Sequence, residues 1–504
     1  MVFDRDVIIC VTPDKYRNDV YDIANLFYKN VIRRRAEQCA EAEPADTISV
    51  SDAGEHIEIR LERPSPDCSP NFSIVNNLAK NRDAKTGAYE LKMALYRMLK
   101  SCSNDILPWG ALVGIRPVKL YASLLNRGMS GAEAAAHMAV KYDVPAKTSR
   151  LCIEIADAQR DILQNCDPRR DYLLYVGIPF CRTKCGYCSF SSDAHNRADK
   201  YAKPYVDALL RELRFAVGRM ERAGRRAIAV YIGGGTPTAL DCSELARLLE
   251  SAAELLSGER PEEFTVEAGR ADTIDRQKLA AIYEITQSVL GGAAKPRICV
   301  NPQTMNRETL RRIGREHTPE DVIDAFRLAR EAGFDNINMD VIAGLPEETA
   351  ADFVNTLEAV SELKPESVTV HTLCIKRSSR FNEFSGMYAY PDARTVEAMR
   401  DAAAVYAGRM GMKPYYLYRQ KNTAGNFENT GYAPDGYACI YNVHEMADSA
   451  DVIAVGAGGA SKFTDAASGR IERVFNVKNL LAYIDRVDEM IRRKDEFFTK
   501  YMNI

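Results

Sequence analysis

GIPFCRTKCGYCSF, residues 177–190, places three cysteines on one short stretch. Cys181, Cys185 and Cys188 have the spacing C-x3-C-x2-C and follow YLLYVGI, whose β-branched and aromatic residues predict a strand. Thiolates grouped this closely suit an iron–sulfur cluster. A zinc ion is the alternative, but a structural zinc site has four ligands and no cysteine or histidine nearby completes one. The stretch therefore predicts a [4Fe-4S] cluster.

A cluster held by three cysteines leaves one iron open, because such clusters usually take four cysteine ligands. The amino and carboxylate groups of S-adenosylmethionine (SAM) suit that open iron. One-electron reduction then releases a 5′-deoxyadenosyl radical. We therefore expect a [4Fe-4S] cluster and SAM as cofactors of a radical enzyme.

Outward from this stretch, strand-like runs alternate with amphipathic helical segments, as in βαβ units. The six runs occupy residues 172–178, 227–233, 263–269, 297–301, 336–344 and 367–373. Helical spacing of apolar residues marks the segments between them, such as 199–224, 243–257, 319–332 and 347–363. Six units fall short of the eight of a closed barrel, so the predicted fold is α/β, a partial (β/α)6 barrel. Its site is expected at the C-terminal ends of the strands.

The chain has 504 residues, more than one hydrophobic core usually holds, so several domains are expected. We assign residues 1–168 to an N-terminal α+β domain, 169–385 to the barrel and 386–504 to a C-terminal domain that covers the substrate. The only tryptophan, Trp109, lies in a stretch rich in glycine and proline. That stretch is either a loop at the edge of a domain or a contact for the substrate.

The charge and hydropathy of the chain give no support to several functional classes. The net charge is −3 with both signs mixed, so the chain has no basic footprint for nucleic acid. No apolar run approaches the ~18 residues of a membrane span. The N-terminus lacks the basic flank and apolar core of a secretory signal. We expect a cytoplasmic protein without a membrane span or a nucleic-acid partner.

Two further strand ends carry candidate binding residues. Gly233, Gly234 and Gly235 end the second run, where the missing Cβ atoms would let the backbone approach the amino group of SAM. The alternative is an ordinary glycine turn. Glu267 ends the third run and would neutralise an ammonium group, unless it is a solvated charge at a strand end.

Three more polar residues follow the later runs. Gln303 comes after the fourth run, Arg315 lies in the following helical segment and Asp340 lies in the fifth run. A carboxylate within an apolar strand needs a partner, and a ribose diol would serve. Asp340 is therefore the strongest candidate of the three.

Seven motifs occur in order over about residues 170–465: GIPFCRTKCGYCSF, GGGTPT, EFTVEAGRADTI, NPQTMNRETLRRIGREHT, NMDVIAGLPEET, VTVHTLCIKRSS and YYLYRQKNTAGNFENTGY. With these motifs the chain resembles the oxygen-independent coproporphyrinogen III dehydrogenases of the radical SAM superfamily. LPWGALVGIRPVKL and AVGAGGASKF are similar to the long branch of that family, which has an N-terminal extension.

The resemblance implies a role for each motif residue. In this family two tyrosines flank SAM, a glycine segment holds its methionine end, and Asp340 and Arg315 match the ribose-binding aspartate and the ion-pairing arginine. The implied SAM pocket comprises Tyr175, Tyr187, Gly233, Gly234, Gly235, Thr236, Glu267, Gln303, Arg315 and Asp340, beside the cluster ligands Cys181, Cys185 and Cys188.

The family reaction is the oxidative decarboxylation of two propionates of coproporphyrinogen III, which gives protoporphyrinogen IX in anaerobic haem biosynthesis. The resemblance therefore implies a tetrapyrrole substrate and a low-potential electron donor such as flavodoxin or ferredoxin. A tetracarboxylate also needs cations, because propionates desolvate poorly without charge-assisted hydrogen bonds. The candidates, each otherwise a solvated surface charge, are Lys376, Arg377, Arg380, Arg419 and Lys421.

Two positions depart from the family pattern. Gly177 stands where the first strand motif usually has a histidine, and Phe190 where well-studied members have a further cysteine. The CSF ending is shared with haem-trafficking relatives. Two alternatives therefore stay open: a haem carrier that binds haem through a side chain such as His371, and a radical SAM enzyme that acts on another tetrapyrrole.

Overall fold

The computed structural model describes residues 3–12, 14–34, 45–52, 56–62, 84–103, 107–114, 116–189, 195–292, 294–376, 378–383, 386–421, 423–465 and 468–502. Its backbone contacts divide the chain into two compact units. The first comprises Met1–Pro117, Ser123–Cys152 and Gly425–Phe427; the second comprises Val118–Ala122, Ile153–Ala424 and Glu428–Ile504. The three domains expected from the sequence stay a prediction.

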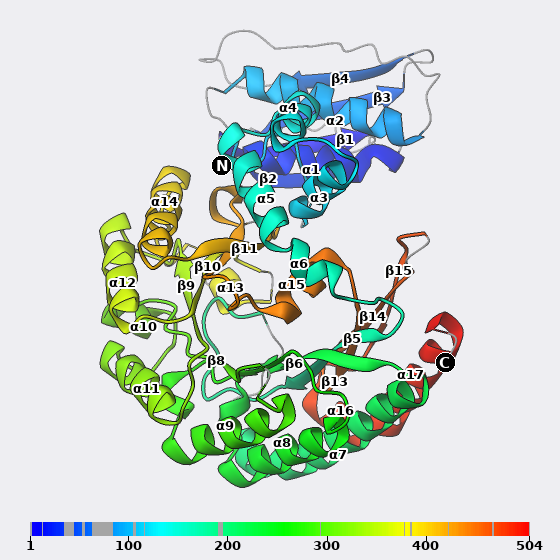
Figure 1. Ribbon diagram of the computed structural model, residues 1–504. Coiled ribbons are helices and arrows are strands. Elements are labelled where there is room, and N and C mark those ends of the chain that lie inside the picture. The colour runs from blue at the N-terminus through cyan, green and yellow to red at the C-terminus, as the bar shows by residue number, and fades with distance from the viewer. Residues whose placement is uncertain are drawn as a thin grey trace. The chain divides into compact units, whose positions relative to one another are not determined.

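The first unit contains a four-stranded sheet in the order β2-β1-β3-β4 (Figure 1). Its strands are β1 (Phe3–Val11), β2 (Tyr28–Arg34), β3 (Asp46–Asp52) and β4 (Ile57–Glu62). Strand β1 is parallel to β2 and β3, and β4 is antiparallel to β3. The strand-like segments DVIICVT, TISVSD and HIEIRLE predict β1, β3 and β4, whereas YKNVIRR of β2 is rich in cations and predicts no strand.

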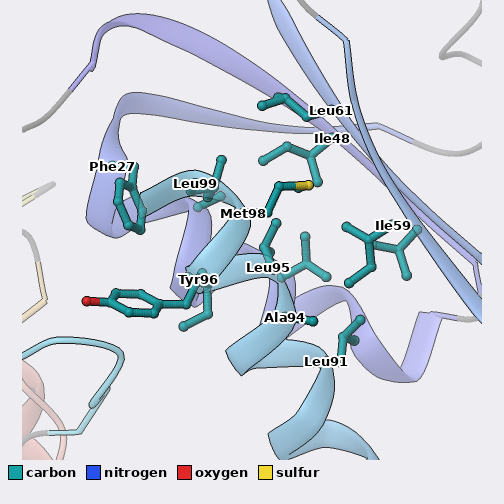
Figure 2. Close-up of a cluster of buried hydrophobic side chains, with 14 of the residues drawn as sticks. Phe27, Ile48, Ile59, Leu61, Leu91, Ala94, Leu95, Tyr96, Met98 and Leu99 are labelled. Atoms are coloured by element: carbon teal, nitrogen blue, oxygen red, sulfur yellow. The ribbon is translucent and has the colours of Figure 1, made fainter. Parts of the chain in front are cut away.

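Helix α2 (Ala84–Ser101) covers this sheet and supplies much of its core. Leu91, Leu95 and Leu99 recur every four residues, so they lie on one face of the helix. Figure 2 shows this face against Ile48 and Ile59 of the strands. All five side chains are buried. The other helices in or bordering the unit are α1 (Arg17–Phe27), α3 (Pro117–Asn126), α4 (Gly131–Tyr142) and α5 (Ala146–Ala158).

The tryptophan loop is a structural element of this unit. Trp109 is 1% exposed, so its side chain is not available to a substrate. Gly110 has φ +54°, and a Cβ atom there would lie 2.2 Å from the carbonyl oxygen of Tyr142. Glycine is therefore required next to the tryptophan by the tight packing of this loop.

The second unit is built on an eleven-stranded sheet in the order β11-β12-β10-β9-β8-β7-β6-β5-β13-β14-β15. Strands β5 to β10 form one parallel series. Their bounds are β5 (Asp171–Ile178), β6 (Arg226–Gly234), β7 (Glu263–Glu267), β8 (Arg297–Cys299), β9 (Ile337–Ala343) and β10 (Ser367–Thr372). The six predicted strands and the α/β class are confirmed, and among the described strands the sheet stays open.

Helices follow these strands and lie along the outer side of the curved sheet (Figure 1). They are α7 (His195–Arg222), α8 (Cys242–Leu256), α9 (Arg276–Leu290), α10 (Arg307–Arg312), α11 (Pro319–Glu331) and α12 (Ala350–Leu363). Local sequence fixes where they begin. Thr318, for example, forms a reciprocal capping box with Asp321, and Pro319 occupies the first turn of α11.

The C-terminal part of the chain extends the same sheet. Its strands are β11 (Lys413–Tyr418), β12 (Asn429–Ala433), β13 (Asp451–Val455), β14 (Ala460–Thr464) and β15 (Ile471–Phe475). Strand β13 pairs in parallel with β5 and so adds to the predicted series. The remaining helices are α6 (Arg160–Gln164), α13 (Arg380–Glu383), α14 (Ala393–Arg409), α15 (Ile440–Ala447), α16 (Leu480–Asp485) and α17 (Val487–Phe497).

A buried ion pair fastens the last helix to the parallel series. Lys494 of α17 donates to Glu212 of α7 at 2.5 Å, and both side chains are 0% exposed. Glu212 also accepts a hydrogen bond from the backbone N–H of Gly456, at the end of β13. The charges are thus paired and hydrogen-bonded, as burial requires.

Candidate functional site

The cysteine loop leaves the end of β5 and is held on two sides by backbone hydrogen bonds. The N–H of Gly186 donates to the carbonyl of Ile313 at 2.9 Å, and the N–H of Phe381 donates to the carbonyl of Gly186 at 2.9 Å. A Cβ atom at Gly186 would lie 2.3 Å from the Phe381 ring, so only glycine fits there. Cys185 is buried, and Cys181 and Cys188 are half-buried.

The glycine segment of β6 packs directly against the start of this loop. The N–H of Gly235 donates to the carbonyl of Ile178 at 2.6 Å, and the N–H of Thr236 donates to the carbonyl of Phe180 at 2.7 Å. A Cβ atom at Gly235 would lie 2.4 Å from the Phe180 oxygen. Contacts within the chain therefore already require glycine at position 235, independently of a ligand.

Thr236 and Gly234 extend the same contact. The Thr236 hydroxyl lies 3.5 Å from the Cys181 sulfur. Gly234 has φ +106°, a backbone conformation that favours glycine. A Cβ atom at Gly233 would lie 2.8 Å from the Tyr231 ring. The segment 233–236 thus holds the end of β6 against the cysteine loop.

The guanidinium group of Arg270 lies beside Cys185. Arg270 Nη1 is 3.6 Å from the Cys185 sulfur and 3.1 Å from the carbonyl of Thr183. Burial opposes the charge of Arg270, but Asp272 and Cys185 raise the pKa of its guanidinium above the usual range. Arg270 was not among the predicted site residues; the sequence signal for it is its position just after the third strand-like run.

Arg315, one of the predicted site residues, links the cysteine loop to neighbouring strand ends. Its guanidinium donates to the Tyr187 hydroxyl at 3.4 Å and to the carbonyls of Asn301 at 2.5 Å and Gly269 at 3.3 Å. Burial opposes its charge, whereas Tyr187 and Cys185 raise the pKa of Arg315. The structure thus brings Arg315, Tyr187 and Cys185 together.

Asp340 already has partners within the protein. Asn338 Nδ2 donates to its Oδ1 at 2.7 Å, and His371 Nε2 lies 3.4 Å from its Oδ2. Burial alone would raise the pKa of Asp340, but His371 and Asn338 lower it below the usual value. Burial also opposes the charge of His371, yet Asp340 raises the pKa of the imidazole. The two side chains form an ion pair on adjacent strands.

Glu267 carries a carboxyl group whose ionisation is influenced by the charge of Asp340. The Tyr231 hydroxyl donates a hydrogen bond to Glu267 Oε1. Burial, together with the charge of Asp340, raises the pKa of Glu267 to about 7. The carboxyl group of Glu267 therefore exchanges its proton near neutral pH, whereas Asp340 stays ionised.

Gln303 has a strained backbone and an unpaired side-chain oxygen. Its φ is +68°, which is uncommon for a residue other than glycine. Its N–H donates to the carbonyl of Asp340 at 2.9 Å. Gln303 Oε1 is buried and makes no hydrogen bond to the described residues. A bound ligand with a donor would satisfy this atom.

The two selected tyrosines occupy different surroundings. Tyr175 stacks on Tyr231 with ring centroids 6.3 Å apart, and burial raises the pKa of its phenol. Tyr187 packs beside an apolar cluster that includes Ile313, Leu345 and Phe381. The Arg315 contact described above is what joins Tyr187 to the polar part of the site.

A cavity of about 580 Å³ opens beside the cysteine loop. Thr183 and Lys184 of that loop line it, together with Gly314, which packs on the loop backbone. The remaining lining is rich in charge and comprises Arg307, Glu308, Arg311, Arg315, Glu316, His317, Thr318 and Arg380.

The donor set suits a cluster with SAM beside it. In the described part of the chain, no three histidine, cysteine or acidic side chains are grouped as a single metal ion would need. A [4Fe-4S] cluster binds each thiolate through a different iron, so its ligands need not share one point. Gln303 Oε1 and Arg315 Nε are buried without a hydrogen-bond partner among the described residues and would receive polar groups of a ligand.

Comparisons with known proteins show which proteins the chain is similar to. A family model described as the radical SAM superfamily matches residues 175–360. The oxygen-independent coproporphyrinogen-III oxidase-like protein HemZ of Bacillus subtilis is 33% identical over 97% of this chain and 98% of that protein. The heme chaperone HemW of Haemophilus influenzae is 27% identical over 62% of this chain and 75% of the relative. The oxygen-independent coproporphyrinogen III oxidase of Escherichia coli is 30% identical over 40% of this chain and 42% of the relative.

The cysteine loop, the parallel sheet and these matches define a radical SAM protein, which uses a [4Fe-4S] cluster and SAM. Within that class, the chain belongs to the family of the oxygen-independent coproporphyrinogen-III oxidase-like proteins. This confirms the resemblance and the cofactors predicted from the sequence. None of the described helices is long and apolar enough to cross a membrane.

Proposed function

We propose that this protein catalyses the SAM-dependent oxidative decarboxylation of coproporphyrinogen III to protoporphyrinogen IX in the cytoplasm. The observation that carries the proposal is the contact of Arg315 with Tyr187 of the cysteine loop and with the carbonyls of Gly269 and Asn301, which follow two neighbouring parallel strands. The family to which the chain belongs, named for likeness to a coproporphyrinogen oxidase, supports the same substrate.

In this proposal Cys181, Cys185 and Cys188 hold the cluster. When bound, the cluster would supply the one electron needed for the reductive cleavage of SAM, and the adenosyl fragment would then take a hydrogen atom from a propionate. Overall, each of two propionates would become a vinyl group: one hydrogen atom would go to the adenosyl fragment of SAM, the carboxylate would leave as CO2, and the remaining electron would pass to a one-electron acceptor. A low-potential one-electron donor protein, such as flavodoxin or ferredoxin, would supply the electron.

The surrounding residues bind and orient SAM. Tyr175 and Tyr187 flank it, and the segment 233–236 shapes the pocket at its methionine end. Asp340, kept ionised by its pair with His371, accepts hydrogen bonds from the ribose hydroxyls. Gln303 Oε1 and Arg315 Nε supply the remaining polar contacts, since neither is satisfied by the described part of the chain. Glu267 accepts a hydrogen bond from the amino group of SAM.

A haem carrier is the second candidate, supported by the HemW relatives. His371 would be its haem ligand, but both of its ring nitrogens have partners. Nε2 lies 3.4 Å from Asp340, and Nδ1 lies 3.2 Å from the Tyr418 hydroxyl. Ligation of haem iron needs one nitrogen released from these contacts. This favours the enzyme over a carrier that uses His371.

The cations proposed for the propionates lie in different surroundings. Lys376 and Lys421 are partly or fully exposed, whereas Arg419 is 7% exposed. Arg380 lines the cavity beside the cysteine loop. Arg377 lies outside the described residues. Lys376, Arg380 and Lys421, which are partly or fully exposed, are therefore the members of the set that we propose for the substrate carboxylates.

The test is an anaerobic incubation of cluster-reconstituted protein with SAM, a low-potential reductant and coproporphyrinogen III, followed by chromatography of the porphyrins. We expect oxidised protoporphyrin after work-up. A parallel spectral titration with haem tests the carrier. Tight haem binding without protoporphyrin formation would replace the enzyme by the carrier, and 5′-deoxyadenosine without protoporphyrin would indicate another substrate.

A further inference from the structure

The contact between Arg270 and Cys185 is a feature that the SAM pocket does not explain. Arg270 is 2% exposed, and its Nη1 lies 3.6 Å from the sulfur of Cys185. The same nitrogen donates to the carbonyl of Thr183 within the cysteine loop at 3.1 Å. A buried cation is thus directed at one particular thiol, where water does little to screen its charge.

Asp272 fixes the direction of this guanidinium. Arg270 Nε and Nη2 each donate to a different oxygen of Asp272 at 3.0 Å, the bidentate geometry that arginine forms with carboxylates. His317 lies behind Asp272, 3.7 Å from its Oδ1, and its side chain is 0% exposed. The outer edge of the guanidinium is therefore occupied by Asp272, and Nη1 is left to face Cys185.

Arg270, Asp272 and His317 lie one behind the other from Cys185, and their charges differ. Burial opposes the ionisation of Asp272, but His317 and Arg270 lower the pKa of the carboxyl well below its usual range. Burial lowers the pKa of His317 and so favours its neutral imidazole, although Asp272 acts in the opposite direction. Cys185 therefore faces the positive charge of Arg270, and the negative charge of Asp272 lies on the far side of the guanidinium.

We propose that Arg270, oriented by Asp272, sets the reduction potential of the cluster that Cys185 helps to bind. Reduction transfers one electron from a low-potential donor protein, so the donor is oxidised, the cluster core gains one negative charge, and no bond is made or broken. A neighbouring cation stabilises the more negative state, and hydrogen bonds to cluster sulfurs are known to tune cluster potentials. Asp272 moderates this effect because its charge has the opposite sign.

The two residues therefore have opposite effects. Removing the positive charge of Arg270 makes the cluster harder to reduce. Removing the negative charge of Asp272 leaves the cation uncompensated and makes the cluster easier to reduce. A general loosening of the loop would move both variants in the same direction. The sign of the shift thus separates an electrostatic role from a merely structural one.

The experiment compares Arg270→Gln, Arg270→Lys and Asp272→Asn with the natural protein after anaerobic cluster reconstitution. Iron and sulfide content per chain is measured first. Redox titration monitored by electron paramagnetic resonance then gives the midpoint potential. Arg276→Gln is the matched control, because Arg276 is 69% exposed and pairs with Glu331 at the surface.

We expect a more negative midpoint for Arg270→Gln, a less negative one for Asp272→Asn, a small change for Arg270→Lys and none for Arg276→Gln. Unchanged midpoints, or shifts of the same sign in Arg270→Gln and Asp272→Asn, would overturn the proposal. If Arg270→Gln fails to retain iron, Asp272→Asn decides: a less negative midpoint supports the proposal, and any other result overturns it. No tetrapyrrole enters the measurement, so it is independent of the proposed substrate.

Discussion

Replacing Glu348 with glutamine is expected to make the stability of the protein less dependent on pH. Glu348 lies just before α12 and is 3% exposed. Its Oε1 accepts a hydrogen bond from the Thr304 hydroxyl at 2.6 Å, next to the strained backbone of Gln303. Burial raises the pKa of this carboxyl group from 4.5 to about 7.

The sign of the effect follows from proton binding. Between pH 4.5 and 7 the folded protein keeps the proton on Glu348, whereas the unfolded chain releases it. The free energy of unfolding of the natural protein therefore falls as the pH rises through this window, and the loss is complete above it. The interval from 4.5 to about 7, at about 1.4 kcal/mol per pH unit, corresponds to about 3 kcal/mol.

Glutamine does not ionise, so Glu348→Gln lacks this loss. We expect the variant to be about as stable as the natural protein at pH 4.5 and about 3 kcal/mol more stable at pH 8. Urea denaturation across this range measures the difference. Glu347→Gln is the control, because Glu347 is exposed and pairs with Arg312 at 2.8 Å. A difference between Glu348→Gln and the natural protein that does not grow with pH would refute the reasoning.

Three further substitutions test other contacts. Lys494→Met leaves Glu212 buried without its partner and should cost about 3 to 5 kcal/mol of unfolding free energy in urea denaturation; a cost below about 1 kcal/mol would contradict the role of this pair. Gly235→Ala places a Cβ atom 2.4 Å from the Phe180 oxygen, so iron content after reconstitution should fall, and full iron binding would show that the contact is dispensable. Asp340→Ala should weaken SAM binding in equilibrium dialysis while iron content stays normal, and unchanged SAM affinity would remove Asp340 from the pocket.

The sequence predicts the parts of this structure that depend on local patterns. The six parallel strands follow from apolar runs separated by amphipathic helices, and the cysteine loop follows from its spacing. Strand β13 was not predictable in this way. It pairs with β5, almost three hundred residues earlier, and no local pattern encodes which strands become neighbours.

The contacts of the functional site were also only partly predictable from local sequence patterns. Asp340 was selected from its place in an apolar strand, but its partner His371 lies on the next strand of the sheet. Arg270 contacts Cys185 although the two residues are 85 positions apart in the sequence, with α7 and α8 between them. The glycines of β6 were assigned to a ligand, whereas the structure gives them close contacts with the cysteine loop. Such assignments depend on strand register and on packing between distant segments.

The most direct test of the account measures 5′-deoxyadenosine and protoporphyrin together in the natural protein and in Cys185→Ala. Cys166→Ala is the control, since Cys166 is half-buried and contacts the backbone of Ser449 away from the loop. The account predicts both products from the natural protein and from Cys166→Ala, with neither product nor bound cluster in Cys185→Ala. Formation of 5′-deoxyadenosine by Cys185→Ala at the natural rate would contradict it.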